Sequence, residues 1–399
     1  MITNNKYNYY FYTSLSILVF ILLLKADTSL SISYKEALNV FVNNSILSVI
    51  TNISIYIFGQ NDIALRLPFI LFYLFSILLM YKLTENYFRY EKDRFIAICT
   101  FMLLPGVLSA SLLVNSAIIV IFLTLLYLYY FEKHEKHSYV LLIFFLFIDN
   151  SFAILYLALF FYSFKNQDKK LMYFSMIFFI FSMYIYGFDT GGRPRGFLVD
   201  TFAIYATVFS PFLFFYFIYS IYRAGIKNER TLTWYISVTA LFVSLIFSFR
   251  QRVYIEDYAP YIVISLPYML KMFFHAYRVR LKEFRRNYNI LAGLVIVMLT
   301  INVILTFVNK PLYLILPNPS KHFVYQYHFV KELAEELKNR GINSITTDNE
   351  ELALRLKFYN IDKGDDYFLS LKNYNYQSER ISIKYYGKEL FVAYLIKLK

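Results

Sequence analysis

Five arginines beside long apolar segments are the residues of this sequence best suited to chemistry. They are Arg66, Arg193, Arg195, Arg250 and Arg252. The planar guanidinium group can hydrogen-bond two phosphate oxygens at once, and arginine is costly at the edge of an apolar span. Residue type and placement therefore predict a site for a phosphate-bearing ligand. Gly191 and Gly192 precede the pair at 193 and 195, and they let the backbone come close to a ligand.

These arginines also have structural interpretations. Arg66 stands four residues after Asp62 at the start of an apolar run, as an arginine that reaches towards the membrane interface would. The pair at 250 and 252 lies close to Glu256 and Asp257, and ion pairing with these carboxylates explains the pair as well as a phosphate does. The sequence leaves these alternatives open.

Carboxylates are the candidate proton acceptors. Those that we expect on the same side of the membrane as the arginines are Asp27, Glu36, Asp62, Asp149, Asp189, Asp200, Glu256 and Asp257. Glu36 begins an amphipathic stretch, where a carboxylate often only offsets the helix dipole. Asp200 directly precedes an apolar run, which favours an N-cap.

Metal and nucleotide chemistry have little support in the sequence. His322 and His328 lack cysteine or acid partners at metal-ligand spacing, so we expect surface histidines and no metal site. The sequence contains no phosphate-binding loop of the P-loop type, no Gly-x-Ser-x-Gly and no His-Glu-x-x-His.

The composition indicates that a membrane positions these groups. Of 399 residues, 58% are hydrophobic and only 17% are charged, whereas soluble proteins carry about 25% charged residues. Several apolar segments approach the ~20 residues that cross a bilayer, and we predict an all-α polytopic membrane protein with about eleven spans. This count treats 139–163 as two short segments that meet at Asp149-Asn150. A soluble Rossmann enzyme, a disordered chain and a secreted disulfide scaffold are excluded, and the single Cys99 is expected in apolar surroundings.

The net charge of +13 agrees with this topology. Most of the excess positive charge falls in short segments that the predicted spans place on one side, which is the cytoplasmic side by the positive-inside rule. The rule explains the basic charge without nucleic acid. It also places the N-terminus inside and the arginines and carboxylates named above outside.

The end of the chain has a different pattern. The spacing predicts helices at 325–340, with a stop at Gly341, and at 349–359, and strands at 342–346, 367–371, 381–385 and 390–398. We therefore predict a transmembrane domain at 1–308, whose first outer loop covers 25–66, and a small extracytoplasmic α/β domain at 309–399.

Several motifs resemble those of the GT-C membrane glycosyltransferases, in the family-39 branch of protein mannosyltransferases and lipid A aminoarabinose transferases. Phe58-Gly59 and Arg66-Leu67-Pro68 are similar to that family's Phe-Gly…Arg-Leu-Pro element. The segment 250–267, which contains Tyr258, Pro260 and Pro267, resembles its basic-Tyr-Pro-Pro element near the lipid-carrier phosphate, and 354–359 loosely matches a tail pattern. Two positions depart from the family: Lys35 occupies the place of the expected catalytic aspartate, and Asn115 replaces another frequent aspartate.

The resemblance implies a metal-independent transferase without a bound cofactor. Such an enzyme moves a sugar from a polyprenyl-phosphate donor to a lipid, glycan or protein acceptor outside the bacterial inner membrane, as in glycosylation of the cell envelope. Glu36 would be the base, with Asp27 as its substitute. Arg66, Arg250, Arg252 and Tyr258 would surround the phosphate, and Arg193 and Arg195 would contact the sugar phosphate or the acceptor.

Two alternatives stay open. A transporter or flippase of lipid-linked sugars has a similar composition but favours polar, broken spans and internal repeats, and we find no repeat. A catalytically inactive scaffold with the same fold would explain Lys35 and Asn115.

Overall fold

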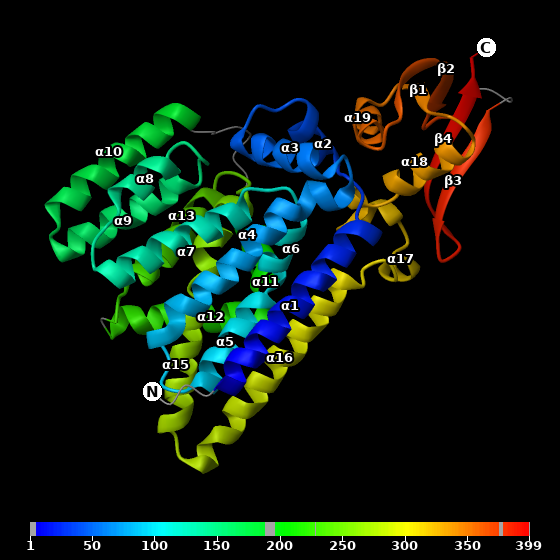
Figure 1. The fold of residues 1–399 in the computed structure, drawn as a ribbon. Coiled ribbons are helices and arrows are strands. Elements are labelled where there is room, and N and C mark those ends of the chain that lie inside the picture. Colours follow the sequence, from blue (N-terminus) through cyan, green and yellow to red (C-terminus); the bar gives the residue numbers. More distant parts are fainter. Residues whose placement is uncertain (1–4, 188–195, 228, 375–377, 399) are drawn as a thin grey trace. The chain divides into compact units, whose positions relative to one another are not determined.

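The chain folds into helices followed by a small sheet, because helices satisfy every backbone hydrogen bond of an apolar span internally. The computed structural model describes residues 5–187, 196–227, 229–374 and 378–398. The chain divides into two compact units, whose elements are labelled in Figure 1. The first comprises Met1–Val19 and Phe69–Thr306, and the second comprises Phe20–Pro68 and Phe307–Lys399.

The first unit is helical. The helices α1 (Asn5–Thr28) and α4 (Asp62–Leu83) contribute several residues to both units, and the helix at 286–307 contributes its last residue, Phe307, to the second. The other helices of the first unit are α5 (Glu91–Met102), α6 (Pro105–Leu112), α7 (Ala117–His134), α8 (Tyr139–Phe145), α9 (Phe152–Asn166), α10 (Lys169–Tyr186), α11 (Leu198–Phe209), α12 (Pro211–Ile226), α13 (Leu232–Ser248), α14 (Ala259–Val263), α15 (Leu266–Val279) and α16 (Arg286–Phe307). Short 3₁₀ turns η1 (Thr84–Asn86), η2 (Ile255–Asp257) and η3 (Lys282–Arg285) connect some of them.

Four of the described helices, α1, α4, α7 and α16, are long and apolar enough to cross a membrane. Three bent helix pairs raise the number to seven if each pair is one span. Pro105 and Pro211 explain two of the bends, since each begins a new helix where its ring prevents the previous one from continuing. The protein is therefore an integral membrane protein, and the count of about eleven spans stays a prediction.

The segment 139–163 contains two helices rather than one. α8 ends at Phe145 and α9 begins at Phe152. The Asp149 carboxylate lies between them and accepts a hydrogen bond from the backbone N–H of Ser151 at 2.9 Å. A charged, turn-forming pair thus separates the two helices where the sequence predicted a break.

The second unit combines α2 (Tyr34–Phe41) and α3 (Ile46–Phe58) with the end of the chain. In chain order, that part contains α17 (Leu312–Ile315), the 3₁₀ turns η4 (Pro319–Lys321) and η5 (Tyr325–Tyr327), α18 (Val330–Asn339), β1 (Ser344–Thr347), α19 (Glu350–Phe358), β2 (Asp362–Ser370), β3 (Glu379–Tyr385) and β4 (Lys388–Lys397). The strand order is β1-β2-β4-β3, with β1 parallel to β2 and the other pairs antiparallel. Leu333, Leu337, Leu356 and Leu369 form the centre of its core.

The predicted α/β pattern of the tail matches these elements, with one difference. The helix expected from 325 begins only at Val330, because Phe329 has a positive φ of 67° and 325–327 form a 3₁₀ turn. The second unit also groups α2, α3 and the tail, which the sequence had assigned to different domains.

Candidate active site and its buried arginine

The second unit contains a cluster of polar side chains in which three charged groups are buried and two further groups are half-buried. It consists of Arg66, Glu36, Asp62, Lys331 and Tyr359, and we call it the Arg66 cluster. α2, α4, α18 and α19 supply its members. Sequence reasoning singled out three of them, Arg66, Glu36 and Asp62, and the fold brings these three together.

Arg66 is at the centre of the cluster and is fully buried. Its Nη2 lies 3.4 Å from Oε2 of Glu36, and its Nη1 lies 3.4 Å from Oδ1 of Asp62. Nη2 also donates a hydrogen bond to the carbonyl oxygen of Ser31 at 3.0 Å. The interpretation of Arg66 as an interfacial arginine is therefore wrong, because its charge is balanced by buried carboxylates and not by solvent.

Glu36 has two structural partners. Its Oε2 accepts a hydrogen bond from the backbone N–H of Ser33 at 2.9 Å, and the Ser33 hydroxyl accepts one from the N–H of Glu36. This reciprocal pair is a capping box, which satisfies two free N–H groups at the start of α2. Glu36 thus stabilises the helix start as well as facing Arg66, and its neighbour Lys35 is exposed.

Asp62 links the cluster to the tail helices. Its Oδ1 accepts a hydrogen bond from the Tyr359 hydroxyl at 2.8 Å, and its Oδ2 lies 3.0 Å from Nζ of Lys331. The same hydroxyl accepts a hydrogen bond from the N–H of Ile32 at 3.1 Å. Burial and the Asp62 carboxylate raise the pKa of Tyr359, so its hydroxyl stays a donor.

Lys331 and Tyr359 were missed by sequence reasoning about the site, and so was Arg355. The Arg355 guanidinium is buried and donates from Nε to the carbonyl oxygen of Ile32 at 2.9 Å and from Nη2 to that of Gln326 at 2.7 Å. The only available signal was the loose tail pattern at 354–359, which contains Arg355 and Tyr359 but does not indicate their partners.

Asp27 lies at the edge of the Arg66 cluster. Its side chain is 54% exposed, and its Oδ1 lies 4.0 Å from Nζ of Lys331, which also donates to its carbonyl oxygen at 2.7 Å. Asp27 is therefore the more accessible of the two predicted bases, whereas Glu36 is the one next to Arg66.

A second candidate site lies in the first unit, as a cavity of about 550 Å³. Apolar side chains such as Phe247 line much of it, and its polar groups come from Asn150, Ser151, Gln251, Arg252, Tyr254, Asp257 and Tyr258. Burial, together with the nearby Asp149 and Glu256 carboxylates, raises the pKa of Asp257 to about 7. A cavity with one arginine, a tyrosine and apolar walls can accommodate a phosphate that is attached to a lipid chain.

Arg250 and Arg252 have exposed side chains. Among the described residues neither forms an ion pair with Glu256 or Asp257, so that alternative is wrong. Both residues follow the end of α13 at Ser248, and Arg252 lines the cavity described above. Arg193, Arg195 and Asp189 lie outside the described residues.

Two further predictions need correction. Asp200 is not an N-cap: Phe197 occupies that position of α11, and Asp200 lies in the first turn, where it offsets the helix dipole. The histidines of the tail are not at the surface, because His322 and His328 are both buried around Tyr313.

Cys99 is half-buried in α5. Within the described ranges, no group of three histidine, cysteine or acidic side chains could hold a metal ion.

Comparison with known proteins identifies the fold. No family model matches the chain, and no curated protein matches it. Two solved structures of ArnT from Cupriavidus metallidurans do match. The apo structure has a TM-score of 0.55 at 8% identity, and the structure bound to undecaprenyl phosphate has a TM-score of 0.57 at 10% identity; each comparison covers 98% of both chains.

This chain has the ArnT fold. ArnT belongs to the GT-C membrane glycosyltransferases, so the resemblance that the sequence motifs indicated is confirmed at the level of the fold. The likeness to ArnT extends over the helical unit and the small α/β part alike. It does not test the family-39 branch, which stays a prediction.

Proposed function

We propose that this protein is a membrane glycosyltransferase that transfers a sugar from a polyprenyl-phosphate donor. The observation that carries the proposal is the likeness, over the full length of both chains, to ArnT bound to undecaprenyl phosphate. The chain brings to this fold what such a donor requires: arginines for the phosphate, an apolar-walled cavity and a carboxylate for proton transfer. A transporter is less consistent with this likeness.

The chemistry follows from the leaving group. When the sugar is transferred, negative charge develops on the lipid phosphate, and a cation stabilises it without any need for a general acid. We assign this role to Arg250 and Arg252, with Tyr258 as a further contact, and give Arg193 and Arg195 the sugar phosphate or the acceptor; Arg66, predicted for the same role, instead pairs with Glu36 and Asp62. The group that attacks the sugar must lose a proton, and a carboxylate accepts it.

Glu36 is our first candidate for this base and Asp27 is its substitute. Glu36 uses Oε2 for both Ser33 and Arg66, and these contacts fix the position of the carboxylate. Asp27 has more access to solvent. The two assignments differ in one respect that can be tested: loss of the Glu36 charge also removes the Arg66–Glu36 ion pair, whereas loss of the Asp27 charge leaves that pair intact.

The proposal extends to location. We infer a bacterial inner membrane, about eleven spans, a cytoplasmic N-terminus and an extracytoplasmic α/β domain at 309–399, where a lipid, glycan or protein acceptor is modified. No cofactor other than the lipid-linked donor enters this mechanism.

The test is transfer from a panel of purified polyprenyl-phosphate sugars in proteoliposomes. Glu36→Gln keeps an oxygen that can accept the Ser33 hydrogen bond but cannot accept a proton, and should lower turnover by about 10²–10⁴-fold. Glu335→Gln, an exposed glutamate of α18, is the matched control. Arg250→Ala should also abolish transfer, whereas Arg286→Ala, an exposed arginine at the start of α16, should not.

The outcomes separate the candidates. Normal turnover in Glu36→Gln together with loss in Asp27→Asn would transfer the base role to Asp27. A wild type that is inactive with every donor would favour the inactive scaffold, which the exposed Lys35 at the expected catalytic position supports.

A further inference from the structure

One cavity of the first unit has no role in the proposed transfer. It encloses about 900 Å³. Its walls come from the segment between α4 and α5, the end of α12, the residues before α13, and α15. None of the residues assigned to donor or acceptor lies in it.

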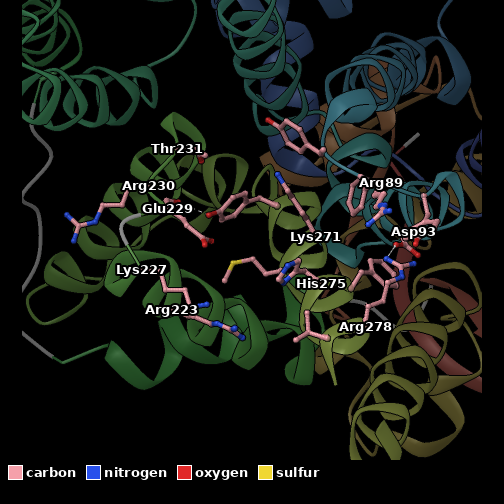
Figure 2. A pocket seen from close by; sticks show the side chains of 17 residues that line it. Arg89, Asp93, Arg223, Lys227, Glu229, Arg230, Thr231, Lys271, His275 and Arg278 are labelled. Atoms are coloured by element: carbon pink, nitrogen blue, oxygen red, sulfur yellow. Dashed lines mark hydrogen bonds and ion pairs between the residues drawn. The ribbon is translucent and has the colours of Figure 1, made fainter. Parts of the chain in front are cut away.

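Cations dominate the walls of this cavity. They are Arg89, Arg223, Lys227, Arg230, Lys271 and Arg278, against two acidic residues, Asp93 and Glu229. Figure 2 shows Arg89, Asp93 and Arg278 on one side and Arg223 and Lys227 on the other, with Lys271 and His275 of α15 between them.

Few of these charges are neutralised within the protein. The buried Asp93 carboxylate is paired with Arg278, and Arg230 donates two hydrogen bonds to the carbonyl oxygen of Gly225. Lys271 lies within electrostatic range of Glu132. Arg89, Arg223 and Lys227 form no ion pair with a carboxylate in the part of the chain that the structure describes. Like charges that line one concave wall repel one another and concentrate anions from solution.

The rest of the wall indicates which kind of anion fits. Aromatic and apolar side chains, including Tyr90, Tyr268, Met272 and Phe274, alternate with the cations. The arginine and lysine groups suit phosphate oxygens, and apolar walls suit the glycerol and the start of an acyl chain. Basic pockets between membrane helices on the cytoplasmic side bind anionic lipid head groups in this way. The helix ends around the cavity are those that the positive-inside rule places inside.

We propose that this cavity binds the phosphate head group of an anionic membrane lipid in the leaflet that faces the predicted cytoplasmic side. The site is separate from sugar transfer. Arg223 and Lys227 contact the phosphate from one wall and Arg89 from the other, and the aromatic side chains hold the glycerol region.

The test uses the full chain in nanodiscs of phosphatidylcholine with and without phosphatidic acid, followed by native mass spectrometry of the lipid retained. The wild type should retain phosphatidic acid in preference to phosphatidylcholine. The double variant Arg223→Gln/Lys227→Gln should retain it about thirtyfold less, as expected for two cations beside a phosphate. The control Lys165→Gln/Lys169→Gln removes two exposed lysines outside the cavity on the same predicted face and should retain the lipid like the wild type.

Three results bear on the proposal, and size-exclusion profiles first show that each variant is folded. Retention by Lys227→Arg together with loss in the double variant supports it. Equal loss of phosphatidic acid in the cavity and control variants would overturn the proposal, since the lipid would then be held by the overall charge of the basic face and not by this cavity. Displacement of phosphatidic acid by inorganic phosphate at similar concentration would also overturn it, because the ligand would then be a soluble phosphate compound and not a lipid.

Discussion

Replacement of Arg66 by methionine provides a direct test of the buried cluster. The guanidinium is fully buried and lies 3.4 Å from both Glu36 and Asp62. Methionine fills most of the volume but has no charge and no donor. Asp62 keeps Lys331 at 3.0 Å, whereas Glu36 loses Arg66, its ion-pair partner at 3.4 Å, and Arg355 stays within electrostatic range of it. The variant therefore removes from a buried carboxylate the ion-pair partner that lies 3.4 Å away.

The expected loss can be estimated. Removal of one partner from a buried ion pair destabilises a protein by about 3–5 kcal/mol, because the remaining charge is desolvated without compensation. Arg340→Met is the matched control in the same unit. Its guanidinium contacts Glu336 and Glu379, whose side chains are 42% and 64% exposed, and partly solvated pairs of this kind contribute about 0–1 kcal/mol.

Hydrogen exchange measured by mass spectrometry on the full chain in detergent reports this difference locally. Peptides that cover α2 and α19 should lose protection by a factor of about 10² or more in Arg66→Met, and by less than about tenfold in Arg340→Met. The double variant Arg66→Met/Glu36→Met should recover part of the protection, because it removes the stranded charge. Equal protection in the Arg66 and Arg340 variants, or a double variant worse than the single one, would refute the reasoning.

Three further predictions concern single groups. Tyr359→Phe removes the hydrogen bonds with Asp62 and with the N–H of Ile32 and should destabilise the second unit by about 1.5–3 kcal/mol. The same hydrogen-exchange experiment measures this loss. The control Tyr386→Phe, at an exposed site, should have little effect. Burial and the nearby Lys310, His322 and Lys25 lower the pKa of His328 from 6.5 to about 3. The neutral ring therefore stabilises the fold above pH 6.5, and this stabilisation is lost as the pH falls towards 3. In a pH series of melting temperatures, His328→Phe should therefore show a smaller decrease on the acid side than the wild type. The pKa of Asp257 is raised from 3.8 to about 7, so the stability of the first unit should fall as the pH rises through this range. Asp257→Asn should remove this dependence of stability on pH. Unfolding can be measured by the fluorescence of the single tryptophan, Trp234. No change in slope in either variant would contradict the corresponding assignment.

The membrane class and the elements of the tail could be predicted because both depend on local patterns. An apolar run long enough to cross a bilayer is a property of consecutive residues. The alternation of strands and helices after residue 340 is likewise set by side chains within one element, such as the Asn349 side chain that accepts the N–H of Leu352 and begins α19. Boundaries were less predictable at 325–330, where Phe329 adopts a left-handed conformation that its residue type does not indicate.

The histidines show why burial was harder to predict. Spacing alone suggested surface positions for His322 and His328, yet both pack around Tyr313, and His322 donates from Nε2 to the carbonyl oxygen of Asn309 at 3.0 Å while its Nδ1 accepts from Val324. Backbone groups of neighbouring turns satisfy the ring, so a polar side chain can be buried there. The sequence does not reveal which carbonyl will be near.

By itself, the sequence determined that the chain is a helical membrane protein with a small α/β part, and that Arg66 and Glu36 deserved a test. Only the tertiary structure decided that Arg66 is neutralised in the interior and that Tyr359, 297 residues further along the chain than Asp62, donates to the same carboxylate. The physical reason is range. Hydrophobic periodicity acts over a few neighbouring residues, whereas a buried ion pair requires partners that only folding brings together, and the low dielectric of the interior then makes each of them indispensable.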